Sequence, residues 1–99
     1  MNNLIKDIEG WSSNRHLDTQ DAGKQLLKLV EEVGELSATY NKRQPNGEID
    51  SVGDIMVVLV IYCQQRGLSI QDFLEYAYDQ ISERKGKMID GVFVKEADL

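Results

Sequence analysis

The sequence is poor in residues that build several common kinds of site. Cys63 is the only cysteine, so the chain cannot form an internal disulfide, and a thiolate metal site is not expected. His16 is the only histidine, which excludes a multi-histidine site within one chain. Pro45 is the only proline, so few positions interrupt helical periodicity along the 99 residues.

Positive charge and long apolar runs are also scarce. The net charge is -6, which argues against a broad nucleic-acid-binding surface and means that a polyanionic substrate needs a cation to mediate its binding. The longest apolar run, Ile55 to Cys63, is far shorter than the roughly 18–20 residues that span a bilayer. Met1 to Gly10 does not resemble a signal peptide. We therefore expect a cytoplasmic protein with no membrane and no nucleic-acid partner.

Helical spacing of apolar residues dominates the chain and predicts one all-α domain over residues 1–99. The segment from Asn41 to Gly47 is expected to be a linker, because Pro45 removes a helical hydrogen bond. The architecture we predict is an antiparallel helix bundle with a short extended C-terminal tail, in which Gly91 to Val94 is β-like. The four predicted helices cover Asn3 to Ser12, Asp18 or Thr19 to Lys42, Glu48 to Arg66, and a segment capped by Ser69 and Asp72 that ends before Gly86.

The third predicted helix is apolar on every side between Ile55 and Cys63. A helix of this kind is buried on every side, and a small domain has little core with which to surround it. We therefore expect a subunit interface along this helix, in a homodimer or a dimer-of-dimers tetramer. The alternative is a central helix in a monomeric bundle.

Two acidic residues interrupt the apolar character of this helix. At about 100° per residue, Asp50 and Asp54 lie near the azimuth of Val57, Val58 and Ile61. A buried carboxylate is costly unless it is paired or binds a metal. The alternative is that both acids only interact favourably with the positive, N-terminal end of the helix dipole. This explanation fits Asp54 less well, because Asp54 lies one turn further into the helix.

The second predicted helix also bears acids, Glu31, Glu32 and Glu35. Taken alone, they form a solvated face that pairs with Lys24 and Lys28. Glu31 and Glu35 are, however, like charges one turn apart, an arrangement that lowers helix stability without a cation. The acids of this helix therefore form either an ordinary solvent-exposed face or a cation-binding site.

A glycine lies next to a carboxylate in both acidic segments, at Gly34 and Gly53. A glycine inside a helix costs roughly 1 kcal/mol relative to alanine. We expect these glycines to let the two segments approach closely where the helices cross. Carboxylate oxygens gathered there would suit a hard divalent cation such as magnesium.

The two segments resemble the MazG-like nucleotide pyrophosphohydrolases, of the all-α NTP pyrophosphatase superfamily. The family's EExxE element is matched by Glu31-Glu32-Val33-Gly34-Glu35, and its ExxD element before an apolar helix by Asp50-Ser51-Val52-Gly53-Asp54. Ser51 stands where the family has glutamate, and the adjacent Asp50 could supply the missing oxygen. The likeness runs from Trp11 to the tail at Asp90 to Glu96 and is to the short phage and Gram-positive members.

The resemblance implies magnesium-dependent hydrolysis of (d)NTP to (d)NMP and pyrophosphate, with manganese as a substitute metal. Glu32, Glu35 and Asp54 are the implied metal ligands, and Asp50 is the fourth candidate. The resemblance also implies that Glu31, Glu32 and Glu35 are the catalytic glutamates. Of these, Glu31 would orient or deprotonate the attacking water molecule, unless it is only a surface acid.

Substrate binding needs positive charge for phosphates and a stacking surface for the base. Three basic residues near the end of the fourth helix, Arg84, Lys85 and Lys87, could reach the phosphate site of a partner subunit. The alternative is that they only stabilise the helix, because positive charge is favourable at any helix C-terminus. The candidates are Lys28, Trp11, Tyr78, Arg84, Lys85 and Lys87. Two alternatives stay open: a phosphoribosyl-nucleotide diphosphohydrolase, and a non-catalytic helical dimer that binds metal or nucleotide for regulation.

Overall fold

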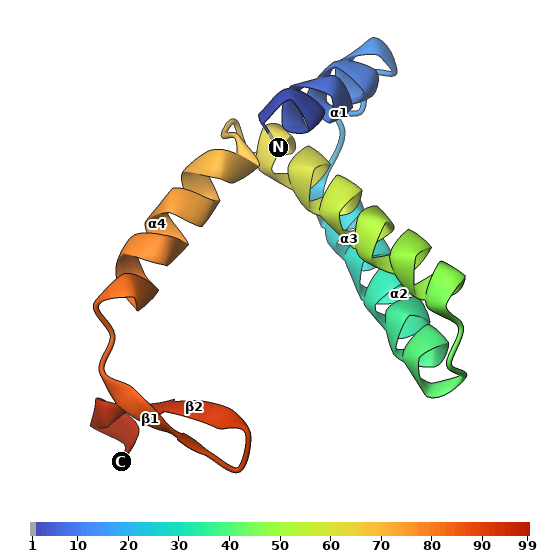
Figure 1. Cartoon of the computed structure of the whole chain (residues 1–99). Coiled ribbons are helices and arrows are strands. Elements are labelled where there is room, and N and C mark those ends of the chain that lie inside the picture. Colours follow the sequence, from blue (N-terminus) through green and yellow to red (C-terminus); the bar gives the residue numbers. More distant parts are fainter. Residues whose placement is uncertain (1) are drawn as a thin grey trace.

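The computed structural model describes residues 2–99 and confirms a mostly helical fold with four helices (Figure 1). α2 and α3 lie side by side, α1 packs near the C-terminal end of α3, and α4 leads away to a two-stranded hairpin. No helix within the described residues is long and apolar enough to cross a membrane. The elements are α1 (Asn2–Asn14), α2 (Ala22–Asn41), α3 (Pro45–Gln65), α4 (Ile70–Ser82), β1 (Gly86–Ile89), β2 (Val92–Lys95) and a 3-10 turn (Glu96–Asp98).

Pro45 begins α3, so the predicted linker is wrong from Pro45 onward. The first N–H groups of a helix have no intrahelical partner, so a proline there sacrifices no hydrogen bond. The Glu48 N–H donates to the carbonyl of Gln44 at 2.9 Å and closes the first turn. Only residues 42–44 connect α2 to α3, which makes the two helices run antiparallel as close neighbours.

Gly47 lies where α3 approaches α2 closely. A Cβ at this position would lie 2.9 Å from Cγ2 of Thr39. The Thr39 hydroxyl donates to the carbonyl of Leu36 at 2.8 Å, which fixes the position of that methyl group. The glycine therefore has a packing role that its position in the sequence did not reveal.

We expect Gly47→Ala to lower the free energy of unfolding by about 1 kcal/mol, because overpacking of this kind costs 1–3 kcal/mol. In a Thr39→Ser background, which lacks the methyl, the same change should become stabilising through the helix propensity of alanine. Urea unfolding of the four forms measures both values. Equal effects in the two backgrounds would contradict the contact.

The start of α2 is later than predicted, because Asp21 rather than Asp18 or Thr19 is its N-cap. Asp21 Oδ1 accepts a hydrogen bond from the Gly23 N–H at 3.0 Å. The hydroxyl of Thr19 instead donates to the carbonyl of His16 at 3.1 Å, within the turns that follow α1. Thr19 therefore belongs to the connection between α1 and α2.

The predicted cap of α4 is confirmed. The Ser69 N–H donates to Asp72 Oδ2 at 3.1 Å, and the Gln71 N–H donates to Ser69 Oγ at 3.3 Å. Ile70 is buried against the core, whereas every residue of α4 from Gln71 onward is exposed. The helix is therefore anchored at its first turn and projects from the rest of the chain (Figure 1).

The C-terminal tail is extended, as predicted, and it folds back on itself as an antiparallel hairpin. Asp90 and Gly91 connect the strands with φ values of 50° and 80°, as a type I′ turn requires. The predicted β-like piece is the second strand, and the first strand, β1, was missed although an Asp-Gly dipeptide is a hairpin signal.

The core is small and lies where α1, α3 and α4 meet. Ile5, Val60, Cys63 and Ile70 form its buried cluster. α3 is the central element, and no residue between Ile55 and Cys63 is exposed. Five of these nine residues are only half-buried, however, so the expectation that this segment is buried on every side is only partly met within one chain.

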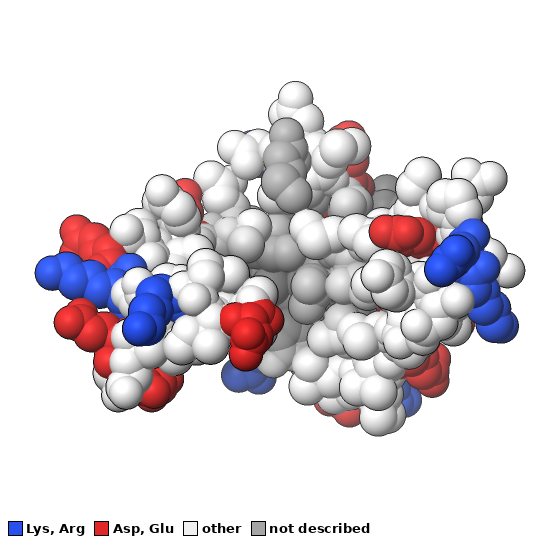
Figure 2. All heavy atoms as spheres, turned by 60° about the horizontal axis from the view of Figure 1, so that its bottom comes forward, with Lys and Arg blue, Asp and Glu red and all other residues white. Residues whose placement is uncertain are grey.

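The chain exposes more surface than a compact monomer of its size. Its accessible area is 7665 Å², whereas a compact 11.2 kDa protein exposes about 5,700 Å². Its radius of gyration is 16.2 Å, against about 13 Å for a globular domain of this length. On the face in Figure 2, most charged side chains lie toward the two outer ends of the molecule.

Candidate active site

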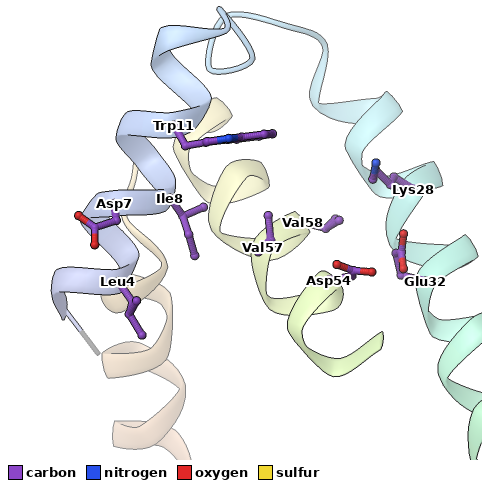
Figure 3. A pocket seen from close by; sticks show the side chains of 9 residues that line it. All are labelled: Leu4, Asp7, Ile8, Trp11, Lys28, Glu32, Asp54, Val57 and Val58. Atoms are coloured by element: carbon purple, nitrogen blue, oxygen red, sulfur yellow. The ribbon is translucent and has the colours of Figure 1, made fainter. Parts of the chain in front are cut away.

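An open cavity of about 560 Å³ lies between α1 and the α2–α3 pair (Figure 3). Its volume falls within the range of small-molecule binding sites. α1 contributes a largely apolar wall, and α2 and α3 contribute charged side chains opposite it. The lining residues are Leu4, Asp7, Ile8, Trp11, Lys28, Glu32, Asp54, Val57 and Val58.

Glu32 lines the cavity close to two other carboxylates, those of Glu35 and Asp54. Its buried Oε2 has no hydrogen-bond partner among the described residues. Burial raises the pKa of Glu32 above its usual value near 4.5, the charges of Glu35 and Asp54 raise it further, and Lys28 opposes the shift. An unpaired carboxylate oxygen beside two other carboxylates is a place where a cation would lower the free energy.

Asp54 reaches the same place from α3. In Figure 3 its side chain extends toward Glu32 on α2, with Lys28 further along α2 on the same side of the cavity. Asp54 lines the cavity together with Val57 and Val58, as expected for one stripe of α3, whereas Asp50 and Ile61 of the same predicted stripe do not line it. It is exposed rather than buried, because the open cavity, not packed protein, adjoins it.

Gly34 and Gly53 do not mark a close approach of the two acidic segments, so that expectation is wrong. A Cβ at either position would meet no atom within 4 Å. α2 and α3 are instead held together by packing along their length and by a hydrogen bond from Gln25 Nε2 to the carbonyl of Val58 at 3.4 Å. That packing alone brings Glu32 and Asp54 to one cavity.

The other predicted acids lie differently. Glu35 is exposed and acts on Glu32 as a neighbouring charge. Glu31 and Asp50 are exposed and do not line the cavity. Among residues 2–99, the ion pair within 4 Å is the one between Lys95 and Asp98, so Glu31 is not paired with Lys24 or Lys28.

The predicted substrate-binding residues divide between two regions. Trp11 and Lys28 line the cavity. Tyr78 lines a separate cleft of about 310 Å³ between α1 and α4. Arg84 and Lys85, which follow α4, and Lys87 in β1 lie at the far end of the α4 arm (Figure 1), so one chain does not bring them to the cavity.

Trp11 was predicted as a substrate-binding residue, but the other residues that α1 contributes to the cavity were missed in the sequence. Leu4, Ile8 and Trp11 recur at helical spacing and form one face of α1, which the structure turns toward the acids of α2 and α3. Asp7 adjoins this face. The signal was a tryptophan at the end of an apolar stripe, but a stripe alone does not say which helix it meets.

Two glutamines near the end of α3 hold α1, which forms the apolar wall of the cavity, in position. Gln64 Nε2 donates to the carbonyl of Glu9 and to Ser13 Oγ, each at 3.0 Å. Gln65 Nε2 donates to the carbonyl of Leu17 at 2.9 Å. These bonds tie α1 and the loop after it to α3, and so they set the width of the cavity.

The residues fit magnesium in number and kind, although they form no complete cage. Within the described chain, no group of three or more His, Cys, Asp or Glu side chains is arranged to hold a metal ion. Magnesium usually keeps several waters and is bound by one or two carboxylates together with substrate phosphates. Glu32, with its unpaired Oε2, and Asp54 supply that number of carboxylates.

The sequence was compared with known protein families, solved structures and curated proteins. No family model matches the sequence, and no solved structure matches it. A protein of Haemophilus phage HP1, described as an uncharacterized 18.2 kDa protein in the rep-hol intergenic region, is 44% identical over 63 residues. The match covers 63% of this chain and 39% of the phage protein, so the chain spans about two fifths of that relative.

Proposed function

We propose that the chain is a magnesium-dependent nucleoside triphosphate pyrophosphohydrolase of the MazG-like type, which converts (d)NTP to (d)NMP and pyrophosphate. The supporting observation is the unpaired carboxylate of Glu32 beside Asp54, in a cavity whose opposite wall includes Trp11. Such a cavity offers one wall to the base and sugar and the other to cation-bound phosphates. Manganese is expected to substitute for magnesium.

Each acid has a defined part in this proposal. Glu32 and Asp54 hold the metal, with Glu35 beside them and Asp50 as a further candidate ligand. Bound magnesium would neutralise phosphate charge and lower the pKa of a water molecule. Glu31, adjacent to Glu32 in sequence, would orient the attacking water or accept its proton, and Lys28 would contact a phosphate oxygen.

Product analysis tests the reaction. The protein is incubated with magnesium and each of the common NTPs and dNTPs, and pyrophosphate and orthophosphate are measured separately. We expect pyrophosphate and nucleoside monophosphate from at least one substrate, and no turnover in excess EDTA. Absence of pyrophosphate from every substrate at high enzyme concentration would sink the proposal.

A binding module without turnover is the second candidate, and Ser51 favours it. Ser51 is 5% exposed and stands where MazG-like proteins have a glutamate of the second acidic element. Nucleotide binding without pyrophosphate release in the same assay would favour this candidate.

We also propose that the functional unit is a homodimer or a dimer-of-dimers tetramer. The chain exposes about 2,000 Å² more than a compact monomer, and two copies that cover this excess would bury an area typical of obligate homodimers. Exposed apolar residues continue along the projecting arm, among them Phe73, Ile81 and Phe93. The hairpin needs support as well, since two strands alone are marginally stable.

A partner subunit would also supply positive charge to the cavity. Among residues 2–99, Lys28 is the one basic residue that lines the cavity, which is little positive charge for a triphosphate. Arg84, Lys85 and Lys87 lie on the arm that would pack against the partner, so we propose that they reach the phosphates of the other subunit. Light scattering should give at least twice the 11.2 kDa chain mass, and a stable monomer at micromolar concentration contradicts the proposal.

A further inference from the structure

Trp11 is exposed at the cavity, and the Arg15 side chain lies against one face of its ring. The Arg15 guanidinium carbon lies 4.1 Å from the centroid of the Trp11 ring. Arg15 Nη1 also donates to the main-chain carbonyl of Trp11 at 3.1 Å, so the guanidinium is fixed at two points one turn after the tryptophan. This geometry combines a cation–π contact with a local cap on the end of α1.

The remaining face of the ring is turned toward the cavity. Trp11 lines the cavity and Arg15 does not. Figure 3 shows the indole extending from α1 across the top of the cavity, above Ile8, Val57 and Val58. With 48% of its surface exposed, the ring has apolar area left that a second planar group could cover.

We propose that Arg15 is a positioning residue that holds the Trp11 indole as a stacking platform for the nucleobase of the ligand. This inference rests on the proposed function for the kind of ligand and adds how its base is received. A base under the indole would place the sugar and phosphates toward Glu32 and Asp54 on the other wall. Because every base has a π face, the platform favours nucleotides over other phosphates without choosing between bases.

Fluorescence tests the platform directly, because Trp11 is the only tryptophan in the chain. The protein is titrated with nucleoside 5′-monophosphates, with the corresponding nucleosides, and with ribose 5-phosphate, which has no base. We expect the nucleotides and nucleosides to quench the emission and ribose 5-phosphate to leave it unchanged. Absence of quenching by every nucleotide, or equal quenching by ribose 5-phosphate, overturns the proposal.

Variants of Arg15 then distinguish its role in positioning the Trp11 ring from the effect of its charge. We expect Arg15→Ala to weaken nucleoside and nucleotide binding alike, by roughly five-fold or more, within the range for loss of base–aromatic stacking. Arg15→Lys, which keeps the charge without the planar fork, should recover only part of the affinity. Arg43→Gln is the matched control, because it removes an exposed arginine in the loop between α2 and α3, and its affinity should equal that of the unmodified chain.

The outcomes distinguish this inference from the proposed hydrolysis. Where Arg15→Ala weakens nucleotides but leaves nucleosides unchanged, Arg15 contacts phosphate and the platform is refuted. Unchanged binding of both ligands by Arg15→Ala refutes it too. Base-dependent quenching that weakens in Arg15→Ala supports the platform even if no pyrophosphate is released. In an active enzyme, Arg15→Ala should raise KM and leave kcat nearly unchanged, and circular dichroism confirms that the helices persist.

Discussion

Replacing Asp54 with asparagine is expected to lower kcat/KM for nucleoside triphosphates by roughly two to three orders of magnitude, the range seen when one preorganised electrostatic group is lost. The change removes one of the two carboxylates that α2 and α3 contribute to the cavity and leaves its shape almost intact. Asp54 is exposed, so the fold should tolerate the substitution with little change in the free energy of unfolding. Pyrophosphate release at saturating magnesium measures the effect.

Asp50→Asn is the variant to compare with Asp54→Asn, because it tests whether the further candidate ligand contributes as much as Asp54. Asp50 lies one turn earlier on α3, is also exposed and does not line the cavity. We expect its loss of kcat/KM to be less than about ten-fold, which would make it at most an outer contributor to the metal site. Equal losses in both variants would show that Asp50 is a full ligand. Retained activity in Asp54→Asn contradicts the site itself.

Glu32→Gln is expected to abolish turnover and, at the same time, to stabilise the metal-free protein. The substitution removes the carboxylate whose Oε2 is buried without a partner, and it ends the repulsion from Glu35 and Asp54. An amide of the same shape also offers N–H donors to these two carboxylates. Activity and metal-free stability should therefore change in opposite directions at one residue, as is typical where function requires an unfavourable charge.

The stabilising effect of Glu32→Gln on the metal-free protein should increase with pH. Because the pKa of Glu32 is raised in the folded state, the folded chain binds this proton more tightly than the unfolded chain does. The contribution of Glu32 to stability is therefore greatest below about pH 4.5 and falls as pH rises through the folded-state pKa. The Tm of Glu32→Gln should match that of the unmodified chain at low pH and exceed it increasingly at higher pH.

Thermal unfolding in EDTA measures this difference, with Glu31→Gln as the control for loss of an exposed glutamate outside the cavity. Magnesium should raise the Tm of the unmodified chain and have little effect on Glu32→Gln, since binding to the folded state alone is stabilising. A Tm difference that does not vary with pH, or an equal response of both proteins to magnesium, contradicts the assignment of Glu32.

The helices were predictable because their signals are local. Ser69 and Asp72 cap α4 through bonds that span two or three residues, and the helical spacing of apolar residues identifies α2. Pro45 shows the limit of such signals. A proline stops a helix from within but begins one at its first turn, and which case applies depends on where the preceding chain reverses.

The acids of the site could be named from their pattern, but the cavity could not. Glu32 and Asp54 belong to different helices whose antiparallel packing follows from the short connection between them. The apolar wall needs a third helix to be placed opposite, and that placement depends on hydrogen bonds from Gln64 and Gln65, whose partners lie 48–55 residues away in sequence. Such pairings leave no periodic trace in the sequence.

The glutamine bonds to α1 and its loop also determine which part of the molecule should open first. α1 is fixed to α3 by Ile5 in a small core and by a few side-chain hydrogen bonds, whereas α2 packs along α3 over much of its length. Local opening of α1 should therefore require less free energy than global unfolding. In hydrogen exchange, the amides of α1 should exchange before those of α3, and a ligand that bridges the cavity should slow them selectively.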